Sequence, residues 1–266
     1  MIRDITIGQY YPAESPIHKL DPRVKLLATL VYIVSLFITT NYVAYVIAAV
    51  FLITMVKISK VPLKFILKGL KAIFMILALT VIFNLFLTTG EPLVSFWKIT
   101  ITKEGLRTAI LMAVRLVFLI IGSSLMTLTT TPNQLTDGME KGLSPLKKIK
   151  IPVHEIAMMM SIALRFIPIL LEETDKIMKA QAARGADFDD GSIIKKAKSL
   201  IPILVPLFVS AFRRANDLAM AMEARCYYGG EGRTKMKPLK YKGRDFAAYF
   251  ILALYLASII VTAVLL

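Results

Sequence analysis

The sequence predicts an all-α, polytopic membrane protein with about five transmembrane helices and a cytoplasmic domain of three amphipathic helices. Hydrophobic residues make up 56% of the 266 positions, and the mean hydropathy of +0.66 is well above that of soluble domains. The apolar residues form long uncharged runs. The lysines and arginines, which give a net charge of +15, lie beside these runs, as the positive-inside rule expects, and form no single polar face for nucleic acid.

Residues 1–25 are predicted to be a cytoplasmic N-terminal segment. They are polar and rich in proline, so they do not resemble a signal peptide. Asp21 followed by Pro22 predicts a helix start, because a carboxylate can cap free N–H groups and proline fits the first turn. Arg23 and Lys25 then lie at the membrane edge, where long cationic side chains can reach the headgroups.

Residues 26–131 are predicted to form four transmembrane helices. No charge occurs from Leu26 to Val56, and one helix over this stretch would measure roughly 46 Å, against a hydrocarbon core of ~30 Å. Two short antiparallel helices joined at the polar step Thr39–Tyr42 are the preferred interpretation, and one long tilted helix is the alternative. The lysines at 57–71 have no acid among them, so this stretch is expected to be a cytoplasmic loop.

The third span is expected over 72–89 and the fourth over about 105–131, and each contains one strongly polar side chain. Asn84 and Arg115 are predicted to reach a comparable depth in the bilayer. An arginine at that depth needs a polar partner or a cavity. A structural hydrogen bond between neighbouring helices is the preferred interpretation of this intramembrane polar contact, and a functional role is the alternative.

Residues 132–243 carry too many charges to cross a bilayer, and prolines divide them into helical pieces at about 133–144, 153–184 and 192–228. Apolar residues recur at three-and-four spacing in the two longer pieces, so each is predicted to be amphipathic. Residues 244–266 are predicted to form the last transmembrane helix, since the run from Phe246 onward has no charge and is long enough to span. Five spans place the C-terminus outside.

The two long amphipathic pieces end in similar sequences. One ends in Ala183-Arg184-Gly185 and the other in Ala224-Arg225-Cys226. A cation near a helix C-terminus followed by a left-handed glycine is an adequate local explanation for one end. It does not require a second copy, whereas small alanines beside an arginine's planar fork of donors suit docking to a partner. Two copies favour two docking points.

With these motifs the chain resembles the transmembrane coupling proteins of energy-coupling factor importers, the CbiQ/EcfT family. Paired Ala-Arg-Gly signatures on cytoplasmic coupling helices are typical of that family. The opening Gly8-x-Tyr10, Ser15-x-x-His18 and Asp21-Pro22-Arg23-x-Lys25 is also similar, and the resemblance covers essentially the whole chain. The family signature has a glycine where this chain has Cys226. The second helix can therefore end differently from the first, and the two contacts need not be equivalent.

The resemblance implies a transmembrane coupling component, with residues 132–243 as the coupling domain, in the plasma membrane of a prokaryote. The expected ATPase-docking residues are Ala183, Arg184, Gly185, Ala224, Arg225 and Cys226. The implied partners are two ABC ATPase subunits and a small membrane protein that binds a vitamin or another micronutrient, within the lipid bilayer and without nucleic acid. ATP and Mg would be bound by the ATPases.

The sequence itself has no P-loop motif and no metal-binding motif of the His-Glu-x-x-His or Cys/His kind. We therefore expect no enzymatic activity, no catalytic residue, no cofactor and no metal site in this chain. His18 and His154 are interpreted as structural residues. The alternative function is a conventional ABC importer permease that forms its own solute path, and a stand-alone transporter would leave the paired arginines unexplained.

Overall fold

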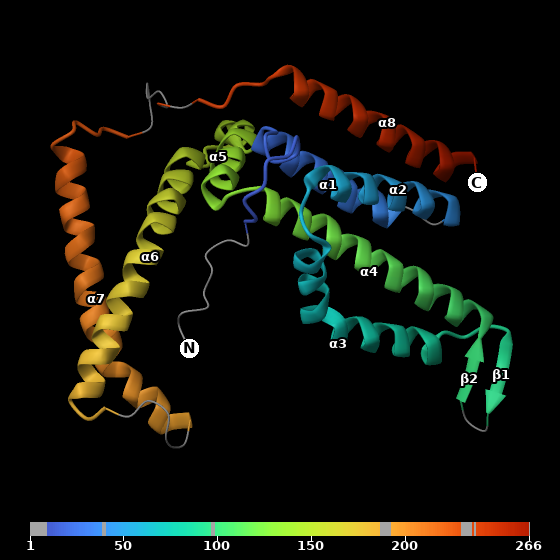
Figure 1. Ribbon diagram of the computed structural model, residues 1–266, viewed down its shortest axis with the longest axis horizontal. Helices are drawn as coiled ribbons and strands as arrows, with labels where there is room; N and C mark the ends of the chain where they lie inside the picture. The colour runs from blue at the N-terminus through green and yellow to red at the C-terminus, as the bar shows by residue number, and fades with distance from the viewer. Residues whose placement is uncertain are drawn as a thin grey trace. The chain divides into compact units, whose positions relative to one another are not determined.

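The computed structural model describes residues 10–38, 41–96, 99–186, 193–229, 236 and 238–265, and it is helical almost throughout (Figure 1). The α-helices are α1 (Pro22–Ile38), α2 (Tyr42–Ser59), α3 (Leu63–Leu87), α4 (Lys103–Thr129), α5 (Pro132–Gly142), α6 (Val153–Ala183), α7 (Ile193–Glu223) and α8 (Gly243–Leu265). A 3-10 helix covers Ser144–Ile149, and the strands β1 (Pro92–Phe96) and β2 (Ile99–Thr102) pair antiparallel. The predicted all-α membrane class is confirmed.

Several predicted helix boundaries are confirmed within a few residues. The uncharged run that begins at Leu26 forms two helices, α1 and α2, and not one long tilted helix. The start of α1 at Pro22 is also as predicted, because the Asp21 carboxylate accepts the backbone N–H of Arg23 at 3.0 Å. At the start of α5, Thr131 and Gln134 exchange side-chain and backbone hydrogen bonds, both at 3.3 Å.

The prediction that the lysine-rich stretch 57–71 forms a loop is partly wrong, because α3 already begins at Leu63. Lys64, Lys68 and Lys71 are spaced by four and three residues, so they share one face of a helix. The helix bends by 60° between Lys71 and Ile73, where the cationic part meets the apolar part. A short amphipathic helix therefore precedes the apolar segment.

Four described helices are long and apolar enough to cross a membrane, namely α2, α4, α6 and α8, and bent α3 is a fifth if its two halves count as one span. The helix α1 has 17 residues, at the short end of what a span requires. The helix α6 qualifies by composition although it was expected outside the bilayer. The assignment of 153–184 to the cytoplasmic side therefore stays a prediction.

The chain divides into two compact units. The bundle unit comprises Gly8–Met139 and Leu239–Leu266, and the hairpin unit contains Glu140–Pro238. In the bundle unit, α1, α2 and α8 share an apolar core. Its buried members are Tyr32, Leu36, Ala44, Ala48, Leu52, Leu252, Tyr255 and Ile259. Gly122 of α4 lies against the ring of Tyr32, and a Cβ there would come within 2.7 Å of it, so only glycine permits this approach.

Candidate functional site: two arginine-ended helices

The helices α6 and α7 of the hairpin unit, each 31 residues long, pack antiparallel. Arg214 of α7 pairs with Glu173 of α6 at 3.2 Å, and Gln181 near the end of α6 donates to the carbonyl of Pro202 in the first third of α7 at 3.4 Å. Figure 1 shows the two helices running in opposite directions. Their C-terminal arginines therefore lie at opposite ends of the pair, and a helix of this length measures roughly 46 Å.

Both helices end in the same hydrogen-bonded turn. After α6, the N–H groups of Gly185 and Ala186 donate to the carbonyls of Ala182 and Gln181, at 2.9 and 3.0 Å. After α7, the N–H groups of Cys226 and Tyr227 donate to Glu223 and Met222, at 2.9 and 3.1 Å. These nested bonds define the Schellman motif, which satisfies the last free carbonyls of a helix. Arg184 and Arg225 occupy the same position in the two turns.

The sequence allowed the second helix to end differently, but the backbone conformation is of the same kind at both ends. Gly185 has a φ of +87°, and Cys226 adopts the left-handed region as well, with a φ of 56°. The Schellman motif requires this conformation, and a side chain with a Cβ adopts it at a cost of about 1 kcal/mol. The difference between glycine and cysteine therefore changes the energy of the turn and leaves its shape unchanged.

The two arginine side chains are exposed, as are the neighbouring Ala183 and Ala224. Within the described part of the chain, neither guanidinium has a hydrogen-bond or ion-pair partner. A guanidinium offers five donors in a planar fork that fits a carboxylate, and a flanking alanine lets another backbone approach closely. Each end therefore presents donors that are unpaired among the described residues and whose geometry fits a carboxylate.

The helix α7 also presents an exposed apolar face. Leu204, Val205, Phe208, Val209 and Phe212 are all more than half exposed, and the rings of Phe208 and Phe212 are 5.7 Å apart. A contiguous apolar face of this kind is typical of a surface that contacts lipid or another protein.

The two polar residues predicted inside the membrane have different partners. Arg115 of α4 donates from Nε to the hydroxyl of Tyr45 in α2, at 2.9 Å, and its guanidinium lies 5.8 Å from the ring of Phe37. Asn84 donates within its own helix to the carbonyl of Thr80, at 2.8 Å. Arg115 thus connects two neighbouring helices, whereas the side chain of Asn84 donates to a carbonyl in the preceding turn of its own helix, α3.

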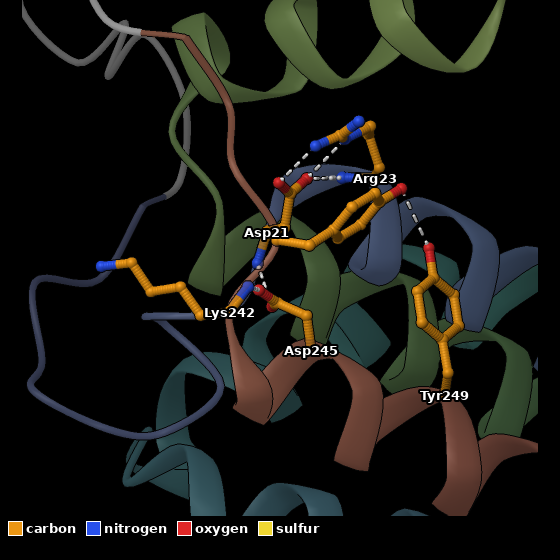
Figure 2. A network of polar contacts seen from close by, with 6 residues as sticks. Asp21, Arg23, Lys242, Asp245 and Tyr249 are labelled. Atoms are coloured by element: carbon orange, nitrogen blue, oxygen red, sulfur yellow. Dashed lines mark hydrogen bonds and ion pairs between the residues drawn. The ribbon is translucent and has the colours of Figure 1, made fainter.

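The Asp21-Pro22-Arg23 motif connects the first and last helices of the bundle unit (Figure 2). The Asp21 carboxylate accepts two bonds from the Arg23 guanidinium, at 3.0 and 2.9 Å, while the Asp21 N–H donates to Asp245 of α8 at 2.9 Å. Asp245 is buried and also accepts the N–H of Lys242 at 2.8 Å. Arg23 lies 4.0 Å above the ring of Tyr241, which adds a cation–π contact.

Burial raises the pKa of the Asp21 carboxyl, but the hydrogen bonds and the positive charge of Arg23 outweigh it, so the pKa lies below its ordinary value. The carboxylate is therefore charged at neutral pH. The Arg23 pKa is raised in turn by the hydrogen bonds to Asp21. Together these contacts form a charged pair at the start of α1.

Both ring nitrogens of His18 lie within hydrogen-bond distance of protein oxygens. Its Nε2 lies 3.0 Å from the carbonyl of Tyr11, and its Nδ1 lies 2.7 Å from the Ser15 hydroxyl. Burial and the charge of Lys25 lower the pKa of His18, so the ring is neutral at neutral pH. A carbonyl can only accept, so Nε2 carries the hydrogen and Nδ1 accepts from Ser15. His154 pairs instead with Glu140 at 2.9 Å.

The described residues contain no cluster of His, Cys, Asp or Glu suited to a metal ion.

Two contacts were not predicted from the sequence. Asp245 is an acid in the first turn of α8, which is a capping signal, but nothing local indicated that it binds the start of α1. The pairing of Glu173 with Arg214 likewise depends on how α6 and α7 pack.

Comparison with known proteins gives consistent matches. The family model described as CbiQ, cobalt transport protein, matches residues 13–236. The energy-coupling factor transporter transmembrane protein EcfT of Clostridium kluyveri is 60% identical, covering 93% of both chains. The EcfT proteins of Ruminiclostridium cellulolyticum and Bacillus subtilis are 54% and 47% identical, and they cover 98% and 100% of this chain, with 97% and 98% of their own lengths.

Proposed function

The chain belongs to the CbiQ/EcfT family of transporter transmembrane proteins, and from this membership we propose that it is the coupling component of an energy-coupling factor importer. In this role it transmits ATP-driven motion from two ATPase subunits to a small membrane protein that captures a vitamin or another micronutrient. The chain itself is not catalytic. ATP and Mg are bound by the ATPase partners.

The observation that carries this proposal is the placement of the two arginine ends. Arg184 and Arg225 occupy equivalent positions in two Schellman turns at opposite ends of one antiparallel helix pair. One small partner cannot cover both ends, whereas a pair of subunits can each take one. A change in the distance between those subunits would then shift the whole length of α6 and α7.

The exposed apolar face of α7 supplies a surface for the third component. Its aromatic and aliphatic side chains, Phe208 and Phe212 among them, suit a membrane protein with an apolar exterior. We place the N-terminus and the hairpin unit on the cytoplasmic side of a prokaryotic plasma membrane, and the C-terminus outside. This orientation follows the lysine-rich stretch 57–71.

The test is a charge reversal at each helix end. Arg184→Glu and Arg225→Glu, alone and together, are made in the full chain co-expressed with its ATPase and substrate-capture partners. Each reversal should weaken ATPase retention at least about 30-fold, because an interface arginine contributes about 2 kcal/mol or more. The double variant should lose uptake and ATPase co-purification while remaining in the membrane.

Arg165→Glu and Arg213→Glu are matched controls, because both arginines are exposed and lie within the same helices, away from their ends. These controls should retain the ATPases. If the double end variant still retains both ATPases and supports uptake, the docking assignment is wrong.

A conventional permease remains the alternative function, and it predicts solute binding by this chain alone. The contacts of Arg115 with Tyr45 and of Asn84 with Thr80 engage these two polar side chains in structural hydrogen bonds. This arrangement favours the coupling role. Equilibrium binding of the transported solute to the purified chain without its partners would support the permease instead.

A further inference from the structure

The bundle unit contains a cavity of about 330 Å³ among α1, α2, α4 and α8. This volume is within the range of small-ligand pockets. The walls are largely aliphatic and aromatic, and among the described lining residues the charged ones are Lys25 and Arg244. The cavity therefore combines a long apolar wall with two positive charges and no negative one.

Lys25 is buried, with 5% of its surface exposed, and its ammonium group has no carboxylate partner in the described part of the chain. It donates to the carbonyls of His18 and Thr129, at 3.1 and 2.8 Å. An ammonium has three N–H donors, so one is left for another acceptor. The nearby Asp21 carboxylate is engaged by Arg23. Burying a charge that has only neutral partners costs free energy, and an anion beside the charge lowers that cost.

Both cations lie at the same end of the cavity. Lys25 is in the first turn of α1 and Arg244 is in the first turn of α8, and the bond from the Asp21 N–H to Asp245 holds these two turns together. From there the cavity follows α1 as far as Tyr32 and α8 as far as Leu252. Seven or eight residues of helix correspond to roughly 11 Å of apolar wall.

We propose that this cavity binds an anionic phospholipid, with the phosphate at Lys25 and Arg244 and one acyl chain along the wall formed by α1 and α8. Basic pockets between transmembrane helices are suited to anionic headgroups. A free phosphate ion would leave the apolar wall uncovered, and a zwitterionic lipid would bring a cation of its own to the basic end. The inference depends on the location of the bundle unit in a membrane and not on the proposed coupling function.

The experiment measures lipid retention by native mass spectrometry on the full chain, titrated with palmitoyl-oleoyl phosphatidylglycerol or with phosphatidylcholine of the same acyl chains. Phosphatidylglycerol should bind at least fivefold more tightly. Arg244→Gln should reduce this affinity about fivefold, as one basic side chain contributes about that factor. Ala248→Phe, which fills the cavity and keeps both cations, should reduce the binding of both lipids.

Arg107→Gln is the matched control, because Arg107 is an exposed arginine near the start of α4 and does not line the cavity. It should leave lipid retention unchanged. Equal affinity for the two lipids, or an equal loss in Arg107→Gln and Arg244→Gln, would overturn the proposal. Displacement of phosphatidylglycerol by millimolar inorganic phosphate, together with unchanged lipid binding in Ala248→Phe, would also overturn the proposal. These two results would identify a site for a free anion.

Discussion

Arg23 of the bundle unit and the helix-end arginines of the hairpin unit have opposite uses. In the bundle unit, Arg23 donates two hydrogen bonds to Asp21 and stacks on Tyr241, so its partners belong to the same chain. In the hairpin unit, Arg184 and Arg225 follow the ends of their helices and are exposed, without a partner among the described residues. The same planar fork of donors therefore stabilises the fold at Arg23 and is available for recognition at Arg184 and Arg225.

A second comparison concerns the two helix ends themselves. Their hydrogen bonds match one for one, although glycine stands in one left-handed position and cysteine in the other. The local geometry thus places both arginines at the same position of the turn. The residue in the left-handed position determines the free-energy cost of forming that turn. The equivalence of the two ends lies in their backbone and not in their sequence.

The largest expected effect separates the buried contacts of the bundle unit from the exposed arginine ends of the hairpin unit. Asp245→Ala should lower the free energy of unfolding by about 3 kcal/mol, because the buried N–H of Asp21 and the partly buried N–H of Lys242 lose their shared acceptor. Arg184→Ala should change it by less than about 0.5 kcal/mol, as for other surface positions. Denaturant unfolding of the detergent-solubilised chain measures both. A comparable loss in the two variants would refute the distinction.

A smaller effect is expected from pH, because protonation of Asp21 leaves the contacts of Asp245 in place. The Asp21 pKa is lowered in the folded chain, so its contribution is complete above the unfolded pKa of about 4 and is lost as the pH falls through the folded value. Thermal unfolding between pH 6 and pH 3 should therefore show less acid destabilisation in Asp21→Asn than in the parent. Identical pH profiles would show that the Asp21–Arg23 pair contributes nothing.

The smallest effects should come from exchanging residues at the two left-handed positions. Gly185→Ala should destabilise the end of α6 by about 1 kcal/mol, because alanine is strained at a φ of +87°. Cys226→Gly should stabilise the end of α7 by up to about 1 kcal/mol for the opposite reason. Amide hydrogen exchange of the last turns measures both changes. Changes of the same sign would contradict the common Schellman geometry.

Much of the helical architecture could be predicted, because uncharged runs and three-and-four spacing are local signals. The division of the run from Leu26 into α1 and α2, and the positions of α6 and α7, follow from them. The helical start of α3 was missed although Lys64, Lys68 and Lys71 share a helical face. For the candidate site, the arginine ends were found from repeated residues, but the left-handed conformation of Cys226 was not, since cysteine gives no local signal for it.

The sequence by itself determined the membrane class, the helix start at Asp21-Pro22 and the two arginine-ended helices, because each depends on residues within a few turns of one another. Tertiary structure alone decided that α6 and α7 run antiparallel, which puts Arg184 and Arg225 at opposite ends. It also decided that Asp245 meets Asp21 across 224 positions of the chain. Apolar helix faces have similar sequences, so the sequence does not show which faces pack together. That is decided only by how the side chains fit against one another.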